Sequence, residues 1–410
     1  MTSKLKIVLI TSGQPSLNPR LVKEADALTE AGFDVTVIHQ YWNEWGTEMD
    51  RKLLPQKKWK TIRVGGTPKE EKITYWQSRL WHKLGQIFSK YIFNSSLTDI
   101  LTIGRCTTLL IAEAKLHKAH LYLAHNLAAL PAAVKAAKKN KAKVGFDAED
   151  FHRNETTDDV HQEAYQLKVR LEEKYLPTVD YITASSSEIS NRYKQLFPML
   201  TPITILNVFD HQDSAKKIKK NNQMLKLVWF SQTIGQNRGL SDILMLIPNF
   251  PNLELHLLGN HDHSVIAQLT KDLGHDFSNQ IFFYPPIPST DLIGFCSKFD
   301  IGLALEPGFS INNDIALSNK IFTYVQAGLA IIASDTTAQQ QFINQFKDLG
   351  ETYDRKNLAT LHAILNRYNE DRDFLIGHQT KAAWYAQHAL NWQQEKQKFL
   401  FVIKRILSID

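Results

Sequence analysis

The chain has 410 residues, of which 43% are hydrophobic and 22% are charged. This length exceeds what a single core commonly fills, so we expect two domains, and the composition excludes a largely disordered protein. No apolar run approaches the roughly 18 residues that span a bilayer. The two cysteines, Cys106 and Cys296, lie far apart without a CxxC or histidine spacing, so the sequence predicts neither a disulfide framework nor a zinc site.

The net charge of +6 is concentrated in residues 51–100, which hold eleven Lys and Arg against three acids, a balance of +8. A basic charge spread over a whole protein favours nucleic acid binding, whereas one basic patch favours a docking surface. We therefore expect no nucleic acid partner. Near the start, Ile7-Val8-Leu9-Ile10 is too short for the core of a signal peptide and suits a buried strand, so we expect a cytoplasmic protein.

The first half of the chain alternates between short β-branched runs and amphipathic segments of helical length. The runs predict strands at Leu5–Thr11, Asp34–His39, Thr61–Val64, His120–His125, Lys143–Asp147, Tyr181–Ala184 and Pro202–Asn207. The segments predict helices at Pro19–Ala31, Cys106–His117, Ala128–Lys139, His161–Tyr175 and Glu188–Leu196. A polar stretch, residues 211–224, then predicts an interdomain linker.

The same alternation restarts after the linker. Strands are expected at Leu225–Phe230, Leu253–Leu258, Ile281–Tyr284, Ile301–Leu305 and Ala330–Ala333. Helices are expected at Leu240–Leu246, Ser264–Leu273, Thr290–Lys298, Leu317–Ala327 and over the last fifty residues. Strands separated by helices indicate parallel sheets covered on both faces. The sequence therefore predicts an α/β protein with two doubly wound, Rossmann-like domains, residues 1–210 and 225–388, and a ligand site in the cleft between them.

The loop after the first predicted strand contains a single glycine, Gly13. A dinucleotide-binding enzyme would need a GxGxxG pattern there, so the loop argues against an NAD enzyme. Gly13 either allows one close approach of the backbone to a ligand or serves only to form the turn.

Polar side chains end the next two predicted strands of the first domain. His125 suits a hydrogen bond to a sugar or the stabilisation of charge at a reacting centre, or it caps the following helix. Asp147, Glu149 and Asp150 follow the next strand and suit an acceptor hydroxyl or a proton transfer, or they are solvated acids at a helix start. The residues alone do not decide among the three acids.

Two cations stand at helix starts of the second domain. Arg238 follows its first strand, and Lys320 begins a later helix at the same edge of the sheet. Either one alone is commonly a surface charge. Two cations at helix starts of one domain favour binding of a diphosphate.

Together these segments resemble the group 1, family 4-like retaining glycosyltransferases with the GT-B fold, over nearly the whole chain. The marks of the resemblance are Pro19-Arg20, Lys23-Glu24-Ala25, Ala31-Gly32, Ala124-His125-Asn126, Phe146-Asp147-Ala148-Glu149-Asp150, Arg238-Gly239-Leu240, Leu257-Leu258-Gly259, Leu317-Ser318-Asn319-Lys320-Ile321-Phe322, Tyr324 and Ala327-Gly328.

The resemblance implies that the second domain binds a nucleotide-diphosphate-sugar and the first binds the acceptor, with residues 389–410 returning to the first domain. It implies that His125 lies beside the transferred sugar, with Asp147 and Glu149 as further catalytic candidates. No metal or other cofactor is expected, since no DxD motif is evident. The implied donor-binding residues are Gly13, Gln232, Arg238, Ser318, Asn319, Lys320 and Thr323.

Two positions depart from the pattern of many relatives. In many relatives, two glutamates separated by seven residues bind the ribose hydroxyls. Here Ile315 and Thr323 occupy these two positions. Glu306 and Asp314 have the same spacing but lie upstream, so the role is not transferred to them. Gln232 stands where relatives often carry a second phosphate-binding arginine.

Residues 73–92 predict an amphipathic helix. Its apolar stripe contains Ile73, Trp76, Leu80, Leu84, Ile87 and Tyr91, widened by Trp81, Phe88 and Ile92. A row of cations runs beside it, formed by Lys72, Arg79, Lys83 and Lys90. This pattern suits either a helix in an anionic membrane surface or an ordinary helix that packs its apolar face on the sheet.

The sequence therefore predicts retaining transfer of a hexosyl-type unit onto a hydroxyl of a growing glycan or lipid-linked acceptor, a step in polysaccharide biosynthesis. The enzyme is expected in the cytoplasm, with residues 51–100 as a possible contact to the inner face of the membrane. Two alternatives stay open: a nucleotide-sugar epimerase on the same fold, and a catalytically silent binding subunit.

Overall fold

The computed structural model describes residues 4–91, 96–211, 224–235, 237–271 and 279–409, and it divides into two compact units. Unit 1 comprises residues 1–206 and 396–410, and unit 2 comprises residues 207–395. These boundaries fall near the predicted ones at 210 and 388. Most of the predicted linker, residues 212–223, lies outside the described residues.

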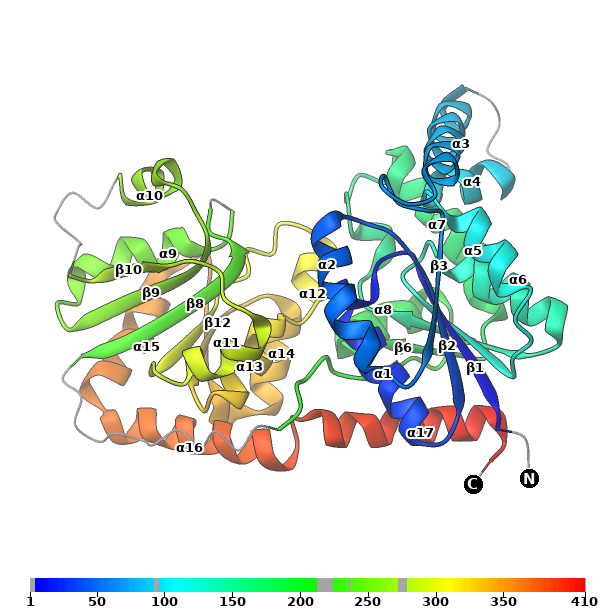
Figure 1. Cartoon of the computed structure of the whole chain (residues 1–410). Coiled ribbons are helices and arrows are strands. Elements are labelled where there is room, and N and C mark those ends of the chain that lie inside the picture. The colour runs from blue at the N-terminus through cyan, green and yellow to red at the C-terminus, as the bar shows by residue number, and fades with distance from the viewer. Residues whose placement is uncertain (1–3, 92–95, 212–223, 236, 272–278, 410) are drawn as a thin grey trace. The chain divides into compact units, whose positions relative to one another are not determined.

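Unit 1 is built on a parallel seven-stranded sheet in the described part of the chain (Figure 1). Its strands are β1 (Lys6–Thr11), β2 (Asp34–Gln40), β3 (Lys60–Val64), β4 (Leu121–His125), β5 (Lys143–Ala148), β6 (Tyr181–Ala184) and β7 (Ile203–Thr204). They follow the order β3-β2-β1-β4-β5-β6-β7. The direction of chain progress reverses between β1 and β4, and the carboxyl ends of strands at such a switch point are where doubly wound folds bind ligands.

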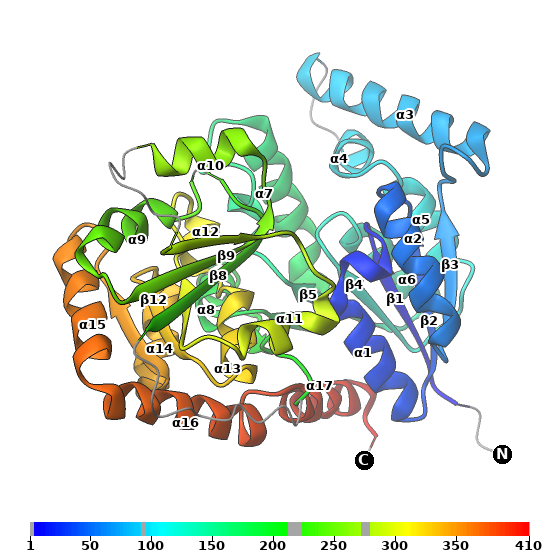
Figure 2. The same ribbon diagram turned by 60° about the vertical axis from the view of Figure 1, so that its left-hand side comes forward.

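The helices of unit 1 connect these strands. They are α1 (Pro19–Glu30), α2 (Glu44–Leu53), α3 (Lys72–Tyr91), α4 (Ser96–Ile103), α5 (Thr107–Ala114), α6 (Leu130–Asn140), α7 (Glu163–Tyr175) and α8 (Ser187–Leu196). Most of the final helix, α17 (Trp392–Leu407), also belongs to unit 1. In Figures 1 and 2, α3 lies outside the sheet with α4 beside it.

Unit 2 repeats the plan with a parallel six-stranded sheet, again counted over the described residues. Its strands are β8 (Leu225–Thr233), β9 (Leu253–Asn260), β10 (Ile281–Tyr284), β11 (Ile301–Ala304), β12 (Ala330–Ser334) and β13 (Gly350–Tyr353). The order β10-β9-β8-β11-β12-β13 places the switch point between β8 and β11. Its helices are α9 (Leu240–Leu246), α10 (His263–Thr270), α11 (Ser289–Cys296), α12 (Ile311–Ile315), α13 (Asn319–Gln326), α14 (Thr337–Gln345), α15 (Leu358–Glu370) and α16 (Arg372–His388).

Both sheets are covered on both faces, so the strands at their centres are largely buried. Every residue of β4 and β12 is buried, and Trp229 on β8 is completely buried. Such strands read as continuous apolar runs in the sequence, which is why the alternation predicted them. The predicted pair of Rossmann-like domains is confirmed.

Candidate functional site

The switch point of unit 1 is held together by local hydrogen bonds. Asn126 follows β4 with a left-handed φ of 72°, a conformation that asparagine tolerates. Its Oδ1 accepts hydrogen bonds from the Thr11 hydroxyl at 2.9 Å and from the Ser12 amide at 3.3 Å. Asn18 caps α1 by accepting a hydrogen bond from the Leu21 amide at 3.0 Å. The start of α1 is therefore fixed against the ends of β1 and β4.

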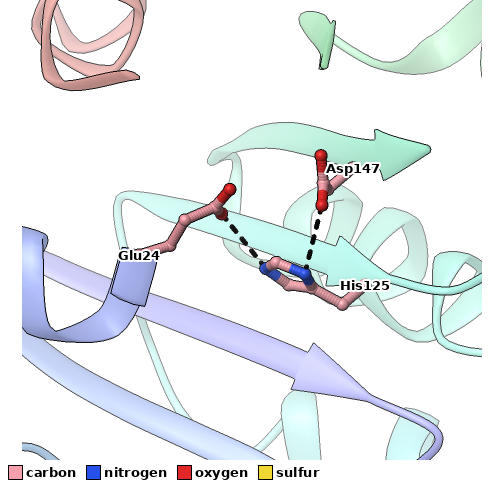
Figure 3. Close-up of side chains that lie close together, drawn as sticks. All are labelled: Glu24, His125 and Asp147. Atoms are coloured by element: carbon pink, nitrogen blue, oxygen red, sulfur yellow. Dashed lines mark ion pairs between the residues drawn. The ribbon is translucent and has the colours of Figure 1, made fainter. Parts of the chain in front are cut away.

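The first turns of α1 place two charged side chains against the ends of β4 and β5. Figure 3 shows Glu24 from α1 and Asp147 from β5 on opposite sides of the His125 ring. His125 Nε2 lies 3.2 Å from Glu24 Oε2, and His125 Nδ1 lies 3.4 Å from Asp147 Oδ2. The Glu24 contact is within hydrogen-bond distance but outside hydrogen-bond geometry, so we describe it as an ion pair. The His125 side chain is completely buried.

Arg20 completes this buried group. Its guanidinium donates to both oxygens of Asp147, at 2.6 and 2.7 Å, and its Nη1 donates to the Ile205 carbonyl at 2.5 Å. The Thr183 hydroxyl donates to Asp147 at 2.6 Å. Burial alone would raise the pKa of Asp147, but the Arg20 charge and the bonds with His125 hold that pKa well below its usual range. Asp147 is therefore a buried anion committed to protein partners.

Glu149 is the member of this group that reaches the surface, with a quarter of its side chain exposed. Its Oε1 lies 3.3 Å from His125 Nδ1 and accepts a hydrogen bond from Asn18 Nδ2 at 2.5 Å. The structure thus brings together the three predicted catalytic residues, but it buries two of them. Of the three, the carboxylate of Glu149 is the group with direct access to solvent.

Glu24, His125 and Asp147 have the residue types of a metal site, with ligand atoms within 4.8 Å of one another. However, the Arg20 guanidinium already occupies both Asp147 oxygens. A divalent cation would have to share these oxygens with a fixed positive charge. We therefore treat the four side chains as an ionic network and assign no metal to it.

Gly13 lies in the β1–α1 loop of unit 1. A Cβ added to Gly13 would meet the Thr11 hydroxyl at 3.7 Å, an ordinary contact, and its φ is not in the left-handed region. The turn itself therefore does not require glycine. Gly13 stays a prediction for close approach of a ligand.

In unit 2, Lys320 and Ser318 share one partner at the start of α13. Glu306 Oε1 accepts a hydrogen bond from Lys320 Nζ at 2.5 Å and from the Ser318 hydroxyl at 2.8 Å. The side chains of Glu306 and Lys320 are each 17% exposed. Because Ser318 bonds Glu306, its hydroxyl does not cap α13.

The loop that carries Arg238 is pressed against the loop that carries Glu306. Gly239 has a φ of 75°, and a Cβ there would lie 2.1 Å from the Leu305 carbonyl oxygen. Only glycine fits this close approach. Arg238 is exposed beside it. A cavity of about 660 Å³ is lined by both loops, including Gly239 and Glu306, and by Asp242 of α9.

The remaining predicted donor-binding residues differ in exposure. Gln232, near the end of β8, and Asn319, the first residue of α13, are exposed. Thr323 is 1% exposed, so its hydroxyl does not face solvent in this structure. The structure thus groups Ser318 and Lys320 around Glu306, while Arg238 is exposed on the neighbouring loop and the role of Thr323 stays a prediction.

The helix predicted from residues 73–92 is present as α3, and it presents its apolar stripe to solvent. The exposed fractions are 76% for Ile73, 61% for Trp76, 57% for Leu80, 58% for Trp81, 43% for Ile87 and 41% for Phe88. The opposite face holds the buried residues Tyr75, Ser78 and Gly85 and packs against α4. Ile92 lies outside the described residues, as do the side chains of Lys90 and Tyr91.

Hydrogen bonds fix the inward face of α3. Ser78 accepts a bond from Arg105 Nη1 at 2.7 Å, and His82 Nδ1 lies 2.8 Å from the Leu101 carbonyl oxygen. A Cβ on Gly85 would lie 2.7 Å from the Leu101 Cβ, so the two helices approach closely at this glycine. The second of the two interpretations, packing of the apolar face on the sheet, is therefore wrong. Within the described residues, no helix has the length and apolar character needed to cross a membrane.

Comparison with known proteins identifies the fold. No protein-family model and no curated protein matches the sequence. Sucrose-phosphate synthase from Thermosynechococcus elongatus matches the structure with a TM-score of 0.70 and 11% identity, covering 99% of this chain and 100% of that one. Anabaena HepE in complex with UDP-glucose matches with a TM-score of 0.67 and 14% identity, covering 98% and 100%.

A Listeria monocytogenes protein assigned as a UDP-N-acetylglucosamine 2-epimerase is also similar, with a TM-score of 0.57 and 12% identity over 98% of this chain and 96% of that one. Identities this low establish the fold and not the activity. The chain therefore has the GT-B fold, as predicted.

Three residues of these groups were not among the predicted site residues. Arg20 and Glu24 entered the prediction only as parts of the motifs that carry the family resemblance. Glu306 entered it only as an acid that lies upstream of the expected ribose-binding glutamates. The signal that links Arg20 and Glu24 is their spacing of four, which places both on one face of α1.

Proposed function

We propose that this protein is a retaining glycosyltransferase of the group 1, family 4-like type. It transfers a hexosyl-type unit from a nucleotide-diphosphate-sugar to a hydroxyl of a glycan or glycolipid. The observation that carries the proposal is the close approach of Gly239, next to Arg238, to Leu305, next to the Glu306 partner of Lys320, at the switch point of unit 2. Arg238 precedes Gly239 and Lys320 is bonded to Glu306, and both Gly239 and Glu306 line one cavity. Two cations in these positions suit a diphosphate leaving group.

In this transfer the protein's main task is to stabilise charge. Arg238 and Lys320 neutralise the leaving diphosphate, with Gly13, Gln232, Ser318, Asn319 and Thr323 as further donor contacts. We propose that the two cations suffice without a metal ion. Turnover that persists in a strong chelator supports this part of the proposal, and full loss of turnover that is restored by a divalent cation contradicts it.

In unit 1, His125, Asp147 and Glu149 form one connected group at the switch point of the sheet. We assign this group to the positioning of the acceptor hydroxyl and the transferred sugar, through Glu149 as its member with access to solvent. The UDP-glucose complex of HepE supports a nucleotide-sugar donor for this fold, although the base and sugar used by this chain are not assigned.

The two alternative functions can be separated by one experiment. UDP-sugars and GDP-sugars are incubated with and without a panel of octyl glycosides as acceptors. A transferase releases the nucleoside diphosphate faster when an acceptor is present. An epimerase changes the donor without any acceptor, and a silent subunit, the alternative that Thr323 and Gln232 keep open, binds the donor without turnover. Only the first outcome supports our proposal.

We also propose that the unit that binds the acceptor contacts a membrane. The exposed apolar stripe of α3 carries Trp76 and Trp81, and the exposed cations Lys72, Arg79 and Lys83 lie along the helix. The Arg79 guanidinium carbon lies over the Trp76 ring, 5.7 Å from the ring centroid. An apolar face with tryptophan beside a row of cations matches a helix that lies in an anionic lipid surface.

Two further exposed tryptophans extend this surface. Trp42 is 65% exposed and Trp45 is 55% exposed at the start of α2. The start of α2 is tied to the segment before α3 by the ion pair between Glu44 and Lys69 at 2.7 Å. We propose that the enzyme binds peripherally at the cytoplasmic face of the membrane and takes part in polysaccharide biosynthesis there.

A further inference from the structure

The protonation state of His125 is restricted by what its ring faces. Nε2 faces the Glu24 carboxylate, and Nδ1 faces the carboxylates of Asp147 and Glu149. A neutral imidazole has one N–H donor and one nitrogen lone pair. In either neutral tautomer, one ring nitrogen would direct its lone pair at a carboxylate oxygen. Only the imidazolium, with two donors, suits both sides of the ring.

The charge balance of the buried group is compatible with the same form. Arg20, Glu24, His125 and Asp147 are all 0–2% exposed. With His125 protonated, two cations balance two anions, and uncompensated charge in such a site is costly. The balance is also met if the proton lies on Glu24 and the imidazole is neutral, so the two forms differ in the position of one proton.

Other elements around the ring add no competing cation among their described residues. From α1, Arg20 and Glu24 face the group, and β5 with its following turn contributes Asp147 and Glu149. From β6, Thr183 donates to Asp147. Burial raises the pKa of the Tyr181 phenol, also on β6, well above its usual value. Burial alone would lower the pKa of His125, but the Glu24 charge and the bonds with Asp147 and Glu149 raise it well above its usual value.

A completely buried ring cannot contact a sugar without a rearrangement of α1. Glu149, by contrast, is a quarter exposed and is held by His125 on one side and Asn18 on the other. Asn18 is itself fixed as the cap of α1. The exposed carboxylate therefore has a defined position that depends on His125.

We propose that His125 is a positioning residue, kept as a buried imidazolium by Glu24 and Asp147, and that it orients Glu149 as the group that contacts the acceptor hydroxyl. The contact with the acceptor rests on the proposed function. The protonation and the orientation of Glu149 do not, because they follow from the folded protein alone.

The test is a long-range ¹H–¹⁵N spectrum of the full-length protein labelled at histidine nitrogens. The His125 resonances are assigned by their loss in His125→Gln. We expect the imidazolium pattern, with a proton on both ring nitrogens, for His125 at pH 7.5. A neutral His125 tautomer at this pH places the proton on Glu24 and overturns the proposal. This spectrum needs no substrate, and the variant serves only to assign the wild-type resonances.

A pair of variants on α1 tests the part played by Glu24. Glu24→Gln removes one carboxylate that faces the ring, and its expected effect is a fall of the His125 pKa by about 1–3 units. Glu30→Gln on the same helix, whose side chain is 60% exposed, is the matched control and leaves the pKa unchanged. An unchanged pKa in folded Glu24→Gln contradicts the proposal.

Turnover separates positioning from catalysis. Glu149→Gln lowers kcat at every pH with little change in the donor KM, whereas Glu24→Gln moves the alkaline limit of the pH profile to lower pH. Turnover of Glu149→Gln equal to that of the wild type overturns the role of Glu149. If no nucleotide-sugar is turned over at all, the proposed function fails while the spectrum still decides the state of His125.

Discussion

The Lys320 ammonium donates to the Glu306 carboxylate at 2.5 Å, and this ion pair fixes the start of α13 against the loop that follows β11. The pair is mostly buried, and Ser318 donates to the same oxygen. Lys320 is thereby held in one position before any ligand arrives. A fixed cation beside a cavity loses less entropy on binding a phosphate than a mobile surface lysine does.

The first prediction follows from this position. Lys320→Met and Arg238→Ala should each weaken the binding of a nucleoside diphosphate by about 1.5–3 kcal/mol, the scale of a hydrogen bond to a charged group. Lys356→Ala, an exposed lysine in the same unit, is the control. Calorimetry measures the three affinities. Equal affinities in all three variants would remove the diphosphate from this part of unit 2.

The second prediction concerns the pH dependence of stability. Burial alone would raise the pKa of Glu306, but the Lys320 charge outweighs it and holds that pKa below its usual value. A depressed carboxyl pKa stabilises the native state above the unfolded pKa, and this contribution is lost as the pH falls through the native pKa.

Glu306→Gln should therefore lower the free energy of unfolding by about 1–3 kcal/mol at pH 7, and this advantage of the wild type should shrink as the pH is lowered from 7 to 3. Urea unfolding of both proteins at the two pH values measures the difference. A difference that stays constant between pH 7 and pH 3 would show that the ion pair is not its cause.

The third prediction tests the membrane contact. Wild-type protein should float with vesicles that contain anionic lipid at low salt, and should bind neutral vesicles more weakly. Arg79→Glu together with Lys83→Glu should release the protein, because each cation near an anionic surface contributes about 1 kcal/mol. Lys356→Glu in unit 2 is the charge-matched control. Wild type that stays unbound but forms dimers through α3 would assign the stripe to a second copy of the chain.

The fourth prediction tests the orientation of α3. Gly85→Ala should destabilise unit 1 by about 1–2 kcal/mol, since the added methyl group meets Leu101 and overpacks the contact with α4. Leu80→Ala, at a residue that is 57% exposed, should leave stability nearly unchanged and weaken vesicle binding. A larger loss of stability in Leu80→Ala than in Gly85→Ala would mean that the apolar stripe is the face of α3 that packs.

Much of the fold was predictable because buried parallel strands are apolar along their length. The strand β13 was missed, since Gly350-Glu351-Thr352-Tyr353 forms no apolar run and lies at the edge of the sheet. The orientation of α3 was not decidable either. A periodic stripe shows which residues share a face, whereas the close approach of Gly85 to Leu101 decides which face packs.

The candidate site was predictable to the level of strand ends. His125 and Asp147 end neighbouring strands, and this made them candidates. Their burial was not predictable, because it depends on Arg20 and Glu24 reaching them from α1. The pairing of Glu306 with Lys320 likewise joins two segments fourteen residues apart that no local pattern connects.

The central claim, that this protein binds a nucleotide-diphosphate-sugar, is tested most directly by calorimetric titration of the wild-type chain with UDP and with GDP. We expect at least one of them to bind more tightly than about 1 mM, a free energy beyond roughly −4 kcal/mol. We also expect Arg238→Ala to weaken this binding. Absence of binding by both nucleotides to folded protein would contradict the account.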